Sequence, residues 1–263
     1  MIDWQYSLLG LFVGAFVGIT GVGGGSLMTP ILVLFFGIHP IAAVGTDLLY
    51  AAITKLVGTV VHARKQTVNW TIVRLLATGS IPGALLTIFL ISSIGKPSGG
   101  AANLIVAALG FMLVLTSVLL IFQKQLLLSV ERWGKPPHAN ISPQHYPWPT
   151  VAVGFIIGVL VTLTSVGAGA LGATMMLILY PRLRLTDIVG SDIAHAVPLA
   201  LIGGIGYWAM GGVDWSLLTS LLAGSIPGII VGSLLATSAS DRFIRPMLAA
   251  VLAVIGMKLI LSS

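Results

Sequence analysis

The sequence lacks cysteine and has little charge. None of its 263 residues is a cysteine, which excludes disulfides, thiolate metal sites and a cysteine nucleophile. Charged residues make up only 8% of the chain, against about 25% in an average soluble domain. The chain contains no G-x4-G-K-[ST] motif for ATP binding and no group of His, Asp and Glu with metal-site spacing. We therefore expect no metal and no cofactor, and a soluble globular fold is excluded by the shortage of polar surface.

Apolar residues fill this chain instead. They amount to 57% of it, with a mean hydropathy of +1.06, which excludes disorder. A membrane helix needs about 20 mostly apolar residues. Runs of that order, or slightly shorter, lie at 4–20, 40–61, 70–94, 101–122, 148–164, 186–210, 214–236 and 242–261. Two shorter runs, 26–37 and 169–180, follow glycine clusters. The pattern predicts an all-α integral membrane protein with about 8–10 transmembrane helices.

The two halves of the chain resemble each other. Three motifs of the first half recur 145 residues later, and a glycine-rich motif recurs after 144. We therefore predict a first transmembrane repeat at 1–122, a polar cytoplasmic linker at 123–147 and a second repeat at 148–263. The motif pairs are Gly45-Thr46-Asp47 with Gly190-Ser191-Asp192, Val68-Asn69-Trp70 with Val213-Asp214-Trp215, Gly79–Gly83 with Gly224–Gly228, and Gly21–Gly25 with Ser165–Gly169.

The distribution of basic residues predicts opposite orientations for the two repeats. The net charge of +6 is explained by the positive-inside rule rather than by nucleic-acid binding, which we do not expect. With five crossings per repeat and the N-terminus outside, only Lys96 and Lys258 lie outside. Five is an odd number, so the second repeat is inverted, as in many secondary transporters. The basic residues then inside are Arg64, Lys65, Arg74, Lys124, Arg132, Lys135, Arg182, Arg184, Arg242 and Arg245. Re-entrant short helices at 26–37 and 169–180 would place Arg182 and Arg184 outside, so the charge count favours full crossing.

The glycine-rich breaks are candidate anion sites. Each break precedes a short apolar helix, whose N-terminus offers N–H groups and the positive end of the helix dipole. The alternative is a tight connection between helices that simply needs small residues. The predicted substrate-binding residues are Gly21, Gly23, Gly24, Gly25, Thr46, Lys55, Ser165, Gly167, Gly169 and Ser191. In contrast, the spacing of Gly79 and Gly83, and of Gly224 and Gly228, favours close helix packing.

Four ionisable residues fall inside long apolar runs: Asp47, Lys55, Asp192 and His195. A charge at that depth costs several kcal/mol, so such residues pair or line a polar path. Two carboxylates at equivalent repeat positions can share a proton. We therefore assign proton coupling to Asp47, Asp192 and His195, and Lys55 to the anion. A structural ion cluster that fixes the helix register is the alternative.

These motifs together resemble the sulfite exporter TauE/SafE family, also called toluene sulfonate uptake permeases. The likeness covers nearly the whole chain outside 123–147, although many members have Gly-Thr-Ser where this chain has aspartate. It implies a multi-helix inner-membrane carrier of sulfite, sulfonates or organosulfur acids. The motifs are Gly18-x-x-Gly21-x-Gly23-Gly24-Gly25-x4-Pro30, Gly45-Thr46-Asp47, Thr54-Lys55-x-x-Gly58-x3-His62 and Val68-Asn69-Trp70.

The sequence therefore predicts a secondary transporter, not an enzyme, that works by alternating access in the inner membrane of a prokaryotic cell. Its expected partners are a small anion, protons and the lipid bilayer, and a homo-oligomer stays open. The alternative is an intramembrane aspartyl protease in which Asp47 and Asp192 activate water. Against it, neither site reads Gly-x-Gly-Asp.

Overall fold

The fold is entirely helical in the computed structural model, which describes residues 3–20, 25–93, 99–132, 147–181, 183–235 and 241–262. These described residues form ten helices and no strand. Five of the helices are long and apolar enough to cross a membrane. The ten are α1 (Trp4–Thr20), α2 (Gly25–Leu34), α3 (Pro40–Arg64), α4 (Trp70–Ser93), α5 (Gly99–Arg132), α6 (Pro147–Thr164), α7 (Ala170–Leu179), α8 (Leu185–Ala209), α9 (Trp215–Leu235) and α10 (Asp241–Ser262).

The helix boundaries follow local sequence signals. The Asn69 side chain accepts hydrogen bonds from the amides of Thr71 and Ile72, and Asp214 accepts one from the amide of Leu217, as N-caps do. Helix α5 extends to Arg132, into the stretch expected to be a solvated linker. The reason is that residues 123–132 are mostly good helix formers and the prolines begin only at 136.

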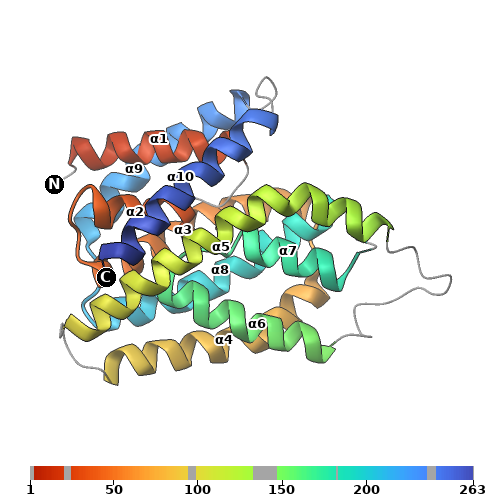
Figure 1. The fold of residues 1–263 in the computed structure, drawn as a ribbon, viewed down its shortest axis with the longest axis horizontal. Coiled ribbons are helices and arrows are strands. Elements are labelled where there is room, and N and C mark those ends of the chain that lie inside the picture. The colour runs from red at the N-terminus through yellow and green to blue at the C-terminus, as the bar shows by residue number, and fades with distance from the viewer. Residues whose placement is uncertain are drawn as a thin grey trace.

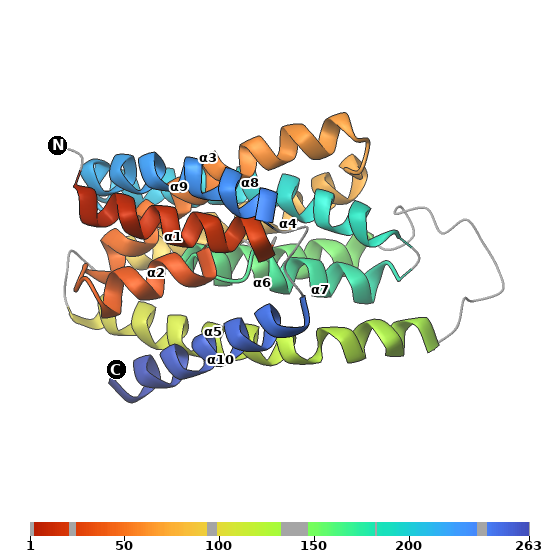
Figure 2. The same ribbon diagram turned by 90° about the horizontal axis from the view of Figure 1, so that it is seen from above.

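Helices from the two halves of the chain pack in matched pairs. Helix α1 runs along α9, and α4 runs along α6 (Figure 1). Helices α3 and α8 pack against each other in the middle, while α5 crosses α10 on one side (Figure 2). Counting helices along each half, α1 corresponds to α6 and α4 to α9, so each pairing has a counterpart. The orientation of the halves in the membrane stays a prediction.

Glycines bring two of these pairs into backbone contact. Gly158 on α6 lies against Ser80 on α4, and Gly14 on α1 lies against Ser225 on α9. The remaining close approaches repeat this arrangement, so the small-residue spacing does serve helix packing. They join Gly10 to Leu221, Gly154 to Leu76, Gly79 and Gly83 to Phe155, Gly224 to Ser7 and Gly228 to Leu11.

Polar and apolar side chains are distributed as a membrane environment demands. Large apolar side chains cover the outside, with Phe12, Phe89 and Val254 exposed by 71%, 66% and 69%. Asp47 and Ser80, in contrast, are fully buried among the helices. Exposed apolar surface of this extent suits contact with lipid chains.

Candidate transport site

The second glycine-rich break is a sharp turn between α6 and α7. Ser165 and Gly167 both have positive φ angles, 58° and 100°, which let the chain reverse direction after Thr164. The amides of Leu171 and Gly172 donate to the carbonyl of Gly167, so these N–H groups are already bonded. The first break, with Gly21, Gly23 and Gly24, lies outside the described residues, and Gly25 is the first residue of α2.

The Asp47 carboxylate is completely buried between three segments. Thr29 on α2 donates its hydroxyl to Asp47 Oδ2 at 2.5 Å, a short hydrogen bond. The hydroxyl of Ser165, from the break of the other half, also lies near this carboxylate. Asp47 Oδ1 has no hydrogen-bond partner among the described residues. The second glycine-rich break thus lies beside a buried acidic group, through the side chain of Ser165. That the breaks bind an anion stays a prediction.

Asp192 is buried in a different environment. It is 3% exposed, and its Oδ1 lies against Gly172 on α7, where a Cβ atom would overlap the carboxylate. This Oδ1 likewise has no hydrogen-bond partner in the described part of the chain. The two aspartates are therefore equivalent in sequence but not in surroundings.

Lys55 connects the two aspartates electrostatically. Its ammonium group interacts most strongly with Asp192 and next with Asp47. Neither carboxylate lies within 4.0 Å of it, since the described residues contain a single ion pair, between Arg184 and Asp187 on the surface. The position of Lys55 in the second repeat is taken by Ala200. One cation thus faces two acids without being locked to either, which leaves it able to attract a further anion.

His195 is tied to α4 rather than to the aspartates. Its Nε2 lies 2.8 Å from the Ser80 hydroxyl, and both residues are buried. Tyr50, at the position equivalent to His195, lies near Ser225, the equivalent of Ser80. The two contacts therefore match at the 145-residue offset.

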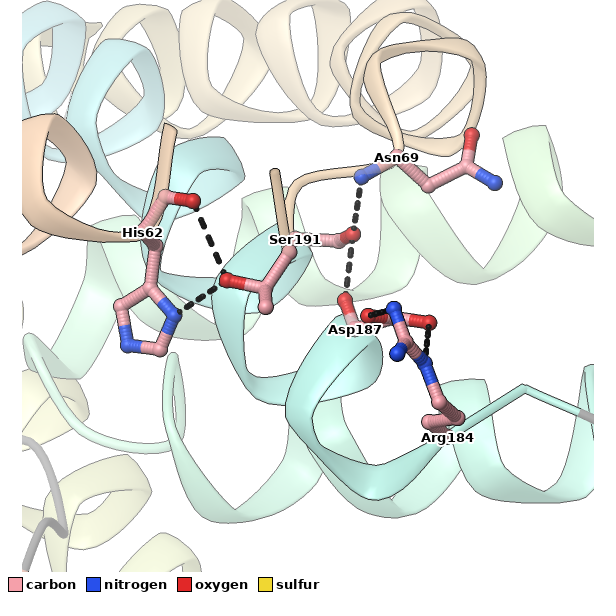
Figure 3. Close-up of polar contacts among 6 residues, drawn as sticks. His62, Asn69, Arg184, Asp187 and Ser191 are labelled. Carbon is pink, nitrogen blue, oxygen red and sulfur yellow. Dashed lines mark hydrogen bonds and ion pairs between the residues drawn. The ribbon is translucent and has the colours of Figure 1, made fainter. Parts of the chain in front are cut away.

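Thr46 and Ser191 occupy equivalent positions in the two halves, and each bonds to the backbone just before a helix of the other half. The Ser191 hydroxyl accepts from the amide of Asn69 at 2.8 Å and donates to the carbonyl of Asp187 (Figure 3). The Thr46 hydroxyl accepts from the amide of Asp214 at 3.1 Å. The Thr46 hydroxyl, in the first half, thus holds the residue that precedes α9. The Ser191 hydroxyl, in the second half, holds the residue that precedes α4.

Sequence reasoning missed Thr29, Tyr50, Ser80, Gly172 and Ser225. The 145-residue offset could have found Tyr50, because it pairs with His195, and it relates Ser80 to Ser225. Thr29 and Gly172 gave no such signal, since a lone Thr or Gly in an apolar run usually serves packing.

The fold and its buried polar cluster define the class of protein: an all-α, multi-pass integral membrane protein that buries Asp47, Asp192 and His195 inside the helix bundle. The family model of the sulfite exporter TauE/SafE matches residues 6–259. The chain belongs to this family, and the resemblance seen in its motifs is confirmed.

Curated relatives agree with this assignment. The chain is 42% identical over 255 residues to "Probable membrane transporter protein YjnA" of Bacillus subtilis, covering 96% of this chain and 98% of the relative. It is 29% identical over 233 residues to "Probable membrane transporter protein YdhB" of the same organism, with 86% and 87% covered. A "Probable membrane transporter protein" of Xylella fastidiosa is 28% identical over 244 residues, with 90% and 86% covered. No solved structure matches. The protein is a membrane transporter.

Proposed function

We propose that the protein is a secondary transporter of small sulfur-containing anions, such as sulfite, sulfonates or organosulfur acids, in the inner membrane of a prokaryotic cell. The family's description supports the substrate class. The observation that carries the proposal is Lys55, a cation on a membrane-spanning helix that faces two buried carboxylates without an ion pair to either. A cation at that depth requires an anionic partner.

Proton linkage is the second part of the proposal. Asp47, Asp192 and Lys55 together carry a net charge of −1 when all three are ionised, and a bound anion would raise the buried negative charge further. Burying uncompensated charge in the membrane costs several kcal/mol. Binding of protons at Asp47, Asp192 or His195 would offset this cost, so anion entry and proton uptake favour each other.

The matched contacts of the two halves support alternating access as the mechanism. Hydrogen bonds join Thr46 to Asp214, Ser191 to Asn69 and His195 to Ser80. Tyr50, the equivalent of His195, lies near Ser225, the equivalent of Ser80. An inverted repeat built in this way would have two related conformations, with the substrate site open to either side of the membrane. The polar cluster between α3 and α8 would stay in place while α1, α4, α6 and α9 rock around it.

Proteoliposome transport tests this function. Purified protein should accumulate radiolabelled sulfite under an imposed pH gradient, and Lys55→Gln should lower uptake about 10-fold to 100-fold, because a bond to a charged group is worth about 1.5–3 kcal/mol. Lys258→Gln, which removes an exposed lysine on α10, is the matched control and should leave uptake unchanged. Uptake that Lys55→Gln does not change, or that ignores the gradient, would contradict the anion site or the proton linkage respectively.

A further inference from the structure

The Asp192 carboxylate lies where a bound anion would be expected. Its Oδ1 is against Gly172, in the first turn of α7, and makes no hydrogen bond among the described residues. The positive end of a helix dipole acts within this first turn. Lys55 directs its strongest electrostatic interaction to the same carboxylate. The first turn of α7 thus contacts a buried oxygen atom that has no hydrogen bond in the described part of the chain, in a carboxylate that Lys55 attracts from beyond 4.0 Å.

The equivalent carboxylate in the first half is held in another way. Asp47 receives the Thr29 hydroxyl at 2.5 Å and lies near Ser165. At the 144-residue offset of the breaks, Thr29 corresponds to Ala173, which has no hydroxyl to donate. Among the described residues, Asp192 therefore contacts a glycine of a short helix and receives no hydroxyl hydrogen bond at Oδ1, whereas Asp47 receives one from Thr29. The Asp192 carboxylate is thus the less firmly fixed of the two.

We propose that the Asp192 carboxylate occupies the anion-binding position of the transporter, as an internal substitute for the substrate. This inference rests on the proposed function and specifies its coupling step. When Asp192 is ionised, its charge offsets that of Lys55 and repels a sulfur oxyanion. When Asp192 takes up a proton, Lys55 loses that partner, and the substrate anion binds beside Gly172. The proton and the substrate thus bind together because the carboxylate and the anion compete for one place.

The other charged groups around Asp192 are few. Helix α3 presents Lys55 and Asp47, and its His62 lies beside Gly190, two residues before Asp192. Helix α8 itself carries His195, which is bonded to the Ser80 hydroxyl of α4. Helix α4 has one charged residue, Arg74, which is exposed. Helices α6 and α7 contain no charged residue. The pH dependence of anion binding should therefore come from Asp192, with Asp47, His62 and His195 as the groups that need a control.

Binding measured on the purified full chain tests the proposal. Ethanesulfonate is the probe for pH dependence because a sulfonate stays a monoanion, and sulfite is measured beside it at one pH. The wild type should lose affinity by about tenfold per pH unit once Asp192 ionises, as linkage to one proton requires. Asp192→Asn should bind as the wild type does at low pH and show no such loss. Asp214→Asn, an N-cap exchange of the same chemistry, should retain the wild-type pH profile.

Three results would overturn the proposal. One is a folded Asp192→Asn protein that keeps the wild-type pH profile. Another is a profile abolished by His195→Gln or Asp47→Asn but not by Asp192→Asn. The third is loss of ethanesulfonate binding in Asp192→Asn while sulfite still binds the wild type. Failure of both sulfite and ethanesulfonate to bind any variant at any pH would instead refute the proposed substrate class, and this inference with it.

A methyl group placed at the position of the Asp192 carboxylate gives a second, independent test of the anion site. Gly172→Ala puts a Cβ atom where the Asp192 carboxylate lies, so the side chain of Asp192 must move away. In the Asp192→Ala background the carboxylate is gone and the added methyl group has room. We expect Asp192→Ala to bind ethanesulfonate and the double variant to bind it at least about tenfold more weakly, a loss of about 1.4 kcal/mol. Equal binding by the two would place the anion elsewhere.

Discussion

Gly158→Ala should loosen the α4–α6 contact and weaken the protein. A Cβ atom at Gly158 would stand 2.7 Å from Ser80 Cα and 2.8 Å from Ser80 C. Carbon atoms pack best at about 3.5–4.0 Å, so the helices must separate by about 1 Å. The obstacle is backbone, and Gly154 makes the same kind of contact one turn earlier. Overpacking of this kind costs about 1–3 kcal/mol. Gly158→Ala should lower the free energy of unfolding by that amount.

The same substitution should also affect the transport site. Ser80, whose backbone receives the added methyl group, is the residue whose hydroxyl bonds to His195 Nε2 at 2.8 Å. A displacement of about 1 Å at Ser80 is large compared with the range of hydrogen-bond lengths, so it should disturb this bond. We therefore expect the rate of sulfite uptake to change together with stability, while its dependence on pH stays that of the wild type.

The loss of stability can be measured by unfolding in mixed micelles of dodecyl maltoside and sodium dodecyl sulfate, followed by tryptophan fluorescence. Gly58→Ala is the control, because its Cβ would meet only Ile193 Cγ2, at 3.3 Å, and alanine is the better helix former. Gly14→Ala, which faces Ser225, should behave like Gly158→Ala. If Gly158→Ala and Gly58→Ala unfold at the same detergent ratio, the backbone contact between α4 and α6 does not limit stability.

Two further substitutions test the hydrogen bonds that join helices. Thr29→Ala removes the donor to Asp47 Oδ2 and should lower the free energy of unfolding by about 1–3 kcal/mol, because a buried carboxyl oxygen loses its hydrogen bond. Thr29→Ser should restore most of this stability, and an alanine variant as stable as the wild type would contradict the bond. Ser191→Ala removes the acceptor for the Asn69 amide and should cost about 1–3 kcal/mol, with faster amide exchange at residue 69 measured by mass spectrometry; unchanged exchange there would show that another group holds this amide.

The helical membrane fold could be predicted from the sequence because lipid imposes simple rules. Apolar runs give the helices to within a few residues, and α3, for instance, ends at Arg64, close to the end of the predicted run at 61. The end of α5 was harder to place, since Leu126, Leu127 and Leu128 let the helix continue among polar residues. Hydropathy measures apolarity, whereas a helix outside the membrane needs only propensity and the absence of proline.

The transport site could be predicted only in outline. Four residues stand out in the sequence because charge is rare inside apolar runs: Asp47, Lys55, Asp192 and His195. In the structure, Lys55 is close enough to interact electrostatically with the other three. Their partners could not be predicted, because the packing of α2 and α7 against α3 and α8 decides which side chains meet. The contact of Asp192 with Gly172 depends on that packing alone.

Pairing between distant helices has a consequence for how the chain is made. Helix α1 depends on α9, since Gly10 and Gly14 have their backbone partners at Leu221 and Ser225. A ribosome adding about 5–20 residues per second delivers these partners roughly 10–40 s after α1 itself. During that interval α1 must remain in the bilayer, or on a chaperone or translocon, without its partner. A chain truncated after the first half would therefore keep α1 without its partner α9. We expect quality-control proteases to degrade such a fragment.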